Sequence, residues 1–155
     1  MADKTLLIAS DHAGLKLKDE IRDRLTALGL SVEDVGVNGE EPVDYPDYAE
    51  IVAERVSTGD SERGILVCGS GVGMAIAANK FPGVRAVHAN DVYTAEMSRK
   101  HNDSNILALS SRGEAKDDPE EIVKTWLNTE FEGGRHQRRI DKISDIEKRI
   151  KENQI

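Results

Sequence analysis

Short apolar runs alternate with amphipathic stretches along most of the chain, and this alternation constrains the fold more than any other feature. Strands are predicted at residues 5–10, 31–36, 64–68, 84–88 and 106–109. The stretches between them have helical apolar spacing or open with Pro, Gly or Asp at a helix start. The pattern predicts an α/β fold: a doubly wound five-stranded parallel sheet of the Rossmann-like type, with helices on both faces. Ligands of such sheets bind beyond the carboxyl ends of the strands.

The length of 155 residues fits one domain, predicted to span residues 1–155. The segment 135–155 has a different character, because Ile140, Ile143 and Ile150 form one helical stripe in otherwise polar sequence. This segment is predicted to be a C-terminal helical tail. It packs either on its own domain or on a partner subunit.

The charge balance limits the partners. With 21 basic and 29 acidic side chains, the net charge is −8, which disfavours nucleic acid as a partner. No apolar run approaches the ~20 residues of a membrane helix, so no membrane partner is expected. Cys68 is the single cysteine, so neither an intramolecular disulfide nor a multi-cysteine zinc site forms. Together with the short apolar stretch after the first residues, this predicts a cytoplasmic protein.

The segment CGSGVG at residues 68–73 is the most informative motif. Its alternate glycines, Gly69, Gly71 and Gly73, allow backbone amides, including that of Val72, to converge on an anion. The spacing differs from the GxGxxG dinucleotide fingerprint and lacks the lysine and hydroxyl of a Walker loop. Neither NAD nor ATP is therefore expected, and no cofactor is predicted.

Cys68 stands where a buried strand meets the glycine turn, a position that favours the thiolate. A thiolate there can act as a nucleophile or as a base. A phosphatase loop would need arginine six positions further on, where this chain has Met74. The alternative is an inert core cysteine, the commoner fate of a lone cysteine at the end of an apolar strand.

Two histidines have informative surroundings. His12 follows the first strand, and Asp11 beside it either fixes its tautomer or holds a sugar hydroxyl. The alternative is that Asp11 caps a helix and His12 is exposed. His101 near the end of a predicted helix reaches the same pocket or caps that helix. His88 and His136 are predicted to be surface or rim residues.

Four arginines stand out in this acidic chain: Arg112, Arg135, Arg138 and Arg139. Their guanidinium groups suit a phosphate monoester, although ordinary surface arginines are the alternative. A cysteine, two histidines and a glycine turn without a metal-ligand cluster indicate metal-free proton chemistry on a small phosphorylated substrate.

Four segments in sequence order carry a resemblance: SDHAG at 10–14, CGSGVGMAIAANK at 68–80, SRKHNDSNILAL at 98–109 and EGGRHQRR at 132–139. Together they resemble the type B ribose-5-phosphate isomerase family over nearly the whole chain. The resemblance implies cofactor-free interconversion of ribose 5-phosphate and ribulose 5-phosphate through a cis-enediolate. It also implies a homodimer, or dimers paired into a tetramer, with each active site shared between subunits.

The resemblance assigns a role to each matching residue. Cys68 matches the base that moves a proton between carbon 2 and carbon 1, and Ser70 helps to orient it. The amides of residues 69–73 form the anion hole for the enediolate oxygen. His101 opens the sugar ring, while Asp11 and Asn102 hold sugar hydroxyls. The residues that surround the phosphate are His12, Arg112, Arg135 and Arg139.

The match has departures. Met74 stands where some members have a glutamate base, so the resemblance implies the cysteine mechanism. Ser70 replaces a frequent threonine but keeps the hydroxyl, and the segment 111–117 is more polar than the apolar continuation usual in the family after the residue that Arg112 matches.

Other functions stay open. The same chemistry serves allose 6-phosphate, galactose 6-phosphate or a four-carbon sugar phosphate, and a sugar-phosphate-binding module without turnover is a further alternative. A flavodoxin-like or receiver-type signalling domain is disfavoured, because only 4% of residues are aromatic and Asp11-His12 stands in place of an acid pair.

Overall fold

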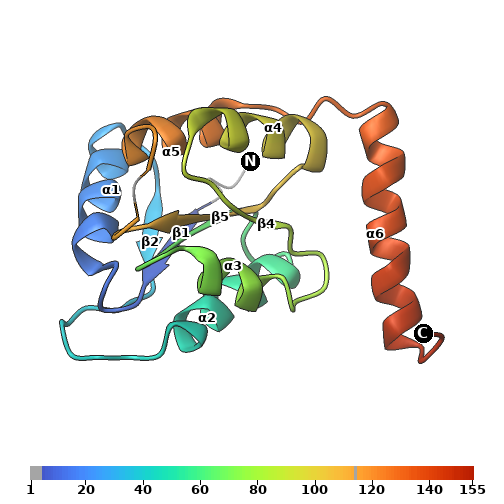
Figure 1. The fold of residues 1–155 in the computed structure, drawn as a ribbon, viewed down its shortest axis with the longest axis horizontal. Helices are drawn as coiled ribbons and strands as arrows, with labels where there is room; N and C mark the ends of the chain where they lie inside the picture. Colours follow the sequence, from blue (N-terminus) through green and yellow to red (C-terminus); the bar gives the residue numbers. More distant parts are fainter. Residues whose placement is uncertain (1–4, 114) are drawn as a thin grey trace.

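The computed structural model describes residues 5–113 and 115–155; residues 1–4 and Glu114, which belong to the predicted single domain, lie outside the described part. Strands and helices alternate up to β5, and two further helices follow it (Figure 1). The strands are β1 (Leu6–Ser10), β2 (Val32–Asp34), β3 (Gly64–Cys68), β4 (Ala86–His88) and β5 (Ile106–Ser110). The helices are α1 (Leu15–Ala27), α2 (Tyr45–Ser57), α3 (Val72–Ala78), α4 (Val92–Asn102), α5 (Pro119–Asn128) and α6 (Arg135–Lys151).

All five strands are parallel and lie in the order β2-β1-β3-β5-β4. The doubly wound parallel sheet predicted from the sequence is therefore confirmed. The edge strands β2 and β4 are shorter than predicted, with three residues each. An edge strand pairs on one side only, so fewer of its residues are held in a ladder.

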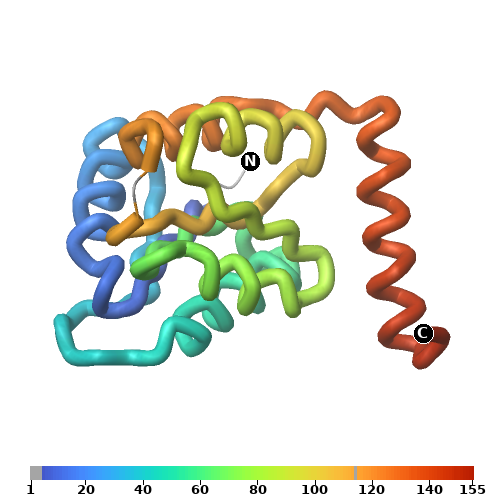
Figure 2. Tube along the Cα trace, viewed as in Figure 1, coloured from blue at the N-terminus to red at the C-terminus, as the bar shows by residue number. Residues whose placement is uncertain are grey.

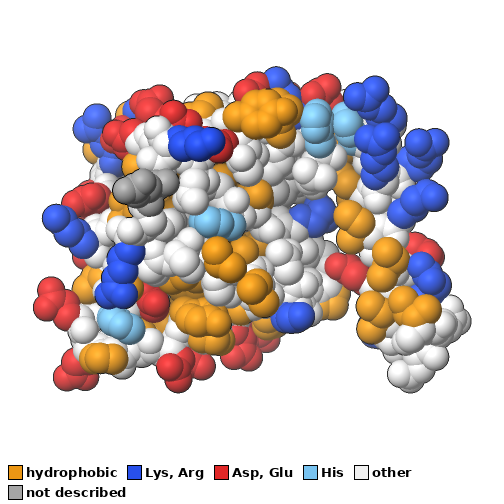
Figure 3. All heavy atoms as spheres, in the orientation of Figure 1, with side chains coloured by type: hydrophobic (Ala, Val, Ile, Leu, Met, Phe, Trp, Pro, Cys, Tyr) orange, Lys and Arg blue, Asp and Glu red, His pale blue; other side chains and the backbone are white. Residues whose placement is uncertain are grey.

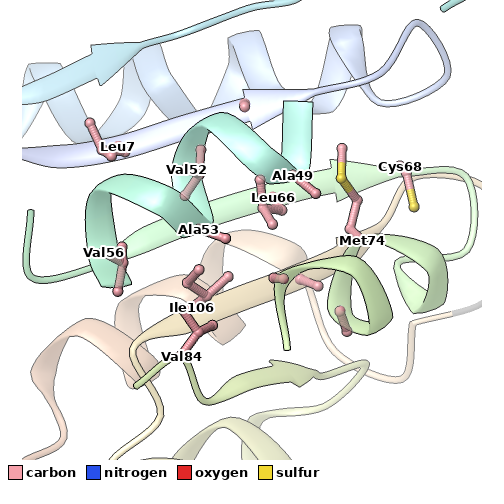
Figure 4. Close-up of a cluster of buried hydrophobic side chains, with 14 residues drawn as sticks. Leu7, Ala49, Val52, Ala53, Val56, Leu66, Cys68, Met74, Val84 and Ile106 are labelled. Carbon is pink, nitrogen blue, oxygen red and sulfur yellow. The ribbon is translucent and has the colours of Figure 1, made fainter. Parts of the chain in front are cut away.

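Each face of the sheet has its own core, because alternate residues of a strand point to opposite faces. On one face Leu7, Leu66 and Ile106 pack against α2 and α3 (Figure 4). On the other face the core includes Ile8 and Trp126, and α1, α4 and α5 cover it. The three central strands are buried along their whole length, which explains their continuous apolar runs.

The strand register brings three loops to one edge of the sheet. Ser10 pairs with Val67, and Cys68 pairs with Ser110, so the carboxyl ends of β1, β3 and β5 lie side by side. The segments that follow these strands therefore meet at the same edge.

The C-terminal helix α6 lies beside the rest of the molecule (Figures 1 and 2), and in its second half the Glu147 carboxylate accepts from Gly83 N–H. Its first half packs on its own domain, where Ile140 is buried. Further along, Ile143, Ile146 and Ile150 are 45%, 42% and 56% exposed, so the predicted apolar stripe is only partly covered. Among the residues with described positions, none of the helices has both the length and the apolar character needed to cross a membrane.

Candidate active site

A pocket opens at the carboxyl edge of the sheet, where three strand-end loops and the starts of two helices meet. Its walls come from the loops after β1, β3 and β5 and from the first turns of α2 and α3. The residues that line it are Asp11, His12, Ala13, Tyr45, Cys68, Gly69, Ser70, Val72, Gly73, Ile76 and Arg112. This is the edge where parallel α/β sheets bind ligands.

Cys68 lies at the base of this pocket, at the end of β3 and beside the start of α3 (Figure 4). The residue is 4% exposed, and it packs with the core on the α2–α3 face while also lining the pocket. The backbone N–H of Gly71 donates to its Sγ at 3.1 Å. An N–H that donates to sulfur stabilises the anionic form.

The glycine turn has a conformation that needs glycine. Gly71 has φ of +77°, in the left-handed region, and precedes the first residue of α3. Gly73 lies directly against Tyr45, because an added Cβ would be 2.6 Å from Cζ of the Tyr45 ring. No local pattern predicts that Tyr45 reaches the turn; its one signal is its position just before Pro46 at a helix start.

The segment after β5 is fastened to this turn by backbone and side-chain hydrogen bonds. Ser111 N–H donates to the carbonyl oxygen of Cys68, and Arg112 N–H donates to that of Gly69, each at 2.9 Å. Ser110 Oγ also donates to the Gly69 carbonyl, at 2.9 Å. Arg112 is therefore held in the pocket wall despite the polar sequence that follows it.

Asp11 and His12 are each held by a backbone amide. Gly14 N–H donates to Asp11 Oδ1 at 2.9 Å, and Val43 N–H donates to His12 Nδ1 at 3.1 Å. Because Nδ1 accepts, neutral His12 carries its proton on Nε2. Val43, and not Asp11, thus fixes the tautomer of His12.

Ser70 is exposed, and its Oγ accepts from Val72 N–H at 3.2 Å. The hydroxyl oxygen of Ser70 therefore accepts a hydrogen bond from the backbone of its own turn.

The remaining predicted residues lie at the opposite edge of the sheet. His101 and Asn102 end α4, just before β5 begins, whereas Cys68 follows the end of β3. A five-residue strand is about 16 Å long, so one chain does not bring these groups together. Arg135 and Arg139 are exposed on the first turns of α6, where basic side chains gather (Figure 3).

His101 stacks on His136, with ring centroids 4.4 Å apart and an interplanar angle of 19°. His136 is 5% exposed, which corrects the prediction of a surface or rim residue. Burial lowers the pKa of His136, and the nearby positive charges of His101, Arg135 and Arg139 lower it further.

His88 fits its predicted rim position only in part. It is half-buried, and its Nε2 is enclosed without a hydrogen-bond partner. No group of three or more His, Cys, Asp or Glu side chains suited to a metal ion occurs within residues 5–113 and 115–155.

The fold and the pocket define an α/β protein in which a thiol, an imidazole and a glycine turn line one pocket at the carboxyl edge of the sheet. A family model described as Ribose/Galactose Isomerase matches residues 6–143. The chain therefore belongs to the ribose/galactose isomerase family, and it is a sugar-phosphate isomerase. This confirms the family indicated by the sequence motifs.

Relatives are similar over almost their whole length. Ribose-5-phosphate isomerase B of Escherichia coli is 47% identical over 94% of this chain and 98% of its own. The structure of ribose-5-phosphate isomerase B from Clostridium thermocellum has a TM-score of 0.90 and 51% identity, over 94% of this chain and 99% of the other. The Mycoplasma genitalium enzyme, solved with bound ribulose 5-phosphate, has a TM-score of 0.88 and 46% identity, over 93% and 96%.

The substrates named for relatives are not all the same. A D-erythrulose-4-phosphate isomerase of Pectobacterium atrosepticum is 40% identical over 92% of this chain and 95% of its own.

Proposed function

We propose that this isomerase interconverts ribose 5-phosphate and ribulose 5-phosphate through a cis-enediolate, with the Cys68 thiolate as the base. The observation that carries the proposal is the contact at the base of the pocket, where the Gly71 amide donates to Sγ at 3.1 Å. The thiolate takes the proton from carbon 2, and the electron pair of that bond forms the carbon–carbon double bond of the enediolate. The proton then returns to carbon 1, while the hydroxyl proton moves from the oxygen of carbon 2 to that of carbon 1.

The negative charge on the enediolate oxygen develops only during the reaction. In the turn at residues 69–73 the amides of Gly71 and Val72 already donate to Cys68 Sγ and Ser70 Oγ, so this oxygen is assigned to the other amides of the turn. Comparable donors contribute roughly 3 to 4 kcal/mol each. Ser70 lies at the exposed end of this turn, where its hydroxyl holds the Val72 amide. Asp11 has a carboxylate oxygen besides the one bonded to Gly14, which supports a contact with a sugar hydroxyl.

The phosphate is assigned to a cluster of donors. His12 offers its Nε2–H, since Nδ1 already accepts from Val43, and Arg112 offers a guanidinium group that suits a phosphate monoester. Arg135 and Arg139 supply further charge only if they come from a second copy, because within one chain they lie beyond the opposite edge of the sheet.

The same reasoning assigns His101 and Asn102 of a second copy to each pocket, with His101 opening the furanose ring and Asn102 holding a hydroxyl. A homodimer also explains the uncovered stripe on α6. One face of this helix carries three large apolar side chains, Ile143, Ile146 and Ile150, that the described part of its own chain leaves exposed. Fully burying one such side chain in an interface contributes about 1.5 to 3 kcal/mol. Whether dimers pair into tetramers stays a prediction, as does a cytoplasmic location.

A coupled isomerase assay over four-, five- and six-carbon aldose phosphates tests the proposed substrate, with and without chelator. The expected result is the highest kcat/KM for ribose 5-phosphate and no effect of the chelator. A higher value for another sugar, such as the four-carbon substrate suggested by the Pectobacterium relative or a six-carbon phosphate of allose or galactose, would replace the substrate but keep the chemistry. Binding without turnover of any sugar would indicate a sugar-phosphate-binding module instead.

Mixing two inactive variants tests the shared site. Cys68→Ala and Arg139→Ala damage residues that the proposal places on different subunits of one pocket. After subunit exchange each mixed dimer has one pocket with both defects and one with neither, so activity should recover to about a quarter of the wild-type value. No recovery, with mixed dimers demonstrated by native mass spectrometry, would contradict the shared site.

A further inference from the structure

His88 ends the edge strand β4, and the proposed mechanism gives it no role. Its side chain is half-buried, but its Nε2 is enclosed and makes no hydrogen bond. An enclosed polar atom without a partner costs about 1 to 3 kcal/mol, so its position calls for a physical reason.

The His88 ring packs directly against the glycine turn. A Cβ added to Gly71 would lie 2.5 Å from His88 Cδ2 and 2.9 Å from Nε2. Because the Gly71 amide donates to Cys68 Sγ at 3.1 Å, the unpartnered Nε2 lies within about 9 Å of the sulfur. The imidazole and the thiol thus both lie against Gly71.

Within the described residues, the titratable side chains nearest this layer are Tyr45, whose ring lies against Gly73, and Asp91, which caps α4 and accepts from Thr94 N–H. The two elements that pack most extensively on β4 are β5 and α3, and neither carries a titratable residue. The charged residues of the nearby pocket, Asp11 and Arg112, come from the loops after β1 and β5. His88 is therefore the group in this layer whose protonation would add a charge beside the turn.

We infer that His88 is a positioning residue whose protonation is coupled to ionisation of the Cys68 thiol across Gly71. A protonated imidazole beside the turn stabilises the thiolate, and the thiolate in turn favours the protonated imidazole. At this distance and an effective dielectric of about 20, one charge changes the thiolate population about 20-fold.

The inference rests on Cys68 as the proposed base, but its test does not depend on turnover. Cys68 is the single cysteine of the chain, so alkylation by iodoacetamide reports on one thiol. The alkylation rate is measured from about pH 5 to about pH 9, because this range spans the ordinary pKa values of His and Cys side chains. The proteins are wild type, His88→Leu, which keeps an apolar group under the turn, and His88→Gln, which keeps a polar group that does not titrate.

Lys80→Gln is the matched control. Lys80 is exposed shortly after α3, so this variant also removes a potential positive charge, but away from the turn. Circular dichroism melting verifies that each variant is folded, and the two His88 variants guard against one of them failing to fold.

The wild-type rate should show a shoulder on its acid limb, as expected for two coupled groups. Both His88 variants should give a single titration whose acid-limb rate is about 20-fold lower, while Lys80→Gln follows the wild type. Superimposable curves for wild type and either folded His88 variant would overturn the inference. If Cys68→Ala kept isomerase activity, the base assignment would fail, and the alkylation result would still decide the coupling.

Discussion

Replacing Gly71 by alanine should damage the reaction far more than the fold. At φ of +77° a Cβ costs about 1 to 2 kcal/mol, and here it would also lie 2.5 Å from His88 and 3.0 Å from the backbone carbon of Leu109. Because backbone cannot yield as a flexible side chain does, the turn itself must shift. That shift moves the amide that donates to Cys68 Sγ. It also moves the neighbouring amides that are proposed to hold the enediolate oxygen, and loss of one oxyanion donor lowers kcat by about 100-fold to 1,000-fold.

Gly83 supplies a matched control for this variant. Its φ is +78°, nearly the same as that of Gly71, but an added Cβ would meet no atom within 4 Å. Gly83→Ala should therefore lose about 1 kcal/mol of unfolding free energy from backbone strain and keep its kcat. Urea unfolding and a coupled isomerase assay on both variants separate the two effects. Equal kcat values for Gly71→Ala and Gly83→Ala would refute the proposed role of the turn.

Three other predictions concern stability and ring opening. Burial alone would raise the pKa of Asp34, but hydrogen bonds from the Gly36 amide, Lys18 and Arg22 outweigh it and hold this pKa below its usual value. Asp34→Asn should cost about 3 kcal/mol in urea unfolding, because it leaves the fully buried Lys18 ammonium with only the more distant Asp19 carboxylate at 3.7 Å. A loss below about 1 kcal/mol would count against this. The lowered pKa of His136 means that native stability falls as the pH drops below about 6.5, the unfolded value. His136→Phe keeps the stack on His101 and should flatten the dependence of stability on pH. Thermal melts from about pH 5 to about pH 7, on both sides of the ordinary His pKa, measure this dependence. An unchanged slope would contradict the role of His136. His101→Ala should lose kcat on ribose 5-phosphate but little on a four-carbon aldose 4-phosphate, which cannot close a furanose ring, and equal losses would remove the ring-opening role.

Much of the fold was predictable because local and global requirements agree. The continuous apolar runs of β1, β3 and β5 indicate strands covered on both faces, and the helices between them supply that cover. The pocket was predictable for a related reason. Parallel strands end at the same edge, so Asp11, Cys68 and Arg112 come together without any knowledge of side-chain contacts.

Other features depend on tertiary contacts that no local pattern encodes. His136 lies on a polar helix face, yet the stack on His101 buries it. Lys18 is fully buried because Asp34 and the Val37 carbonyl oxygen accept its hydrogen bonds. The separation of His101 from Cys68 follows from the direction of α4, which returns to the amino edge of the sheet before β5.

The role of Cys68 is tested most directly by the isomerisation rate of Cys68→Ala, measured beside calorimetric binding of a phosphorylated sugar. The variant should lose about 1,000-fold or more in kcat, since a positioned general base contributes up to about 10,000-fold, while its affinity for the ligand stays within a few-fold of the wild type. A kcat close to that of the wild-type protein, with ligand binding intact, would contradict the assignment of this thiol as the base.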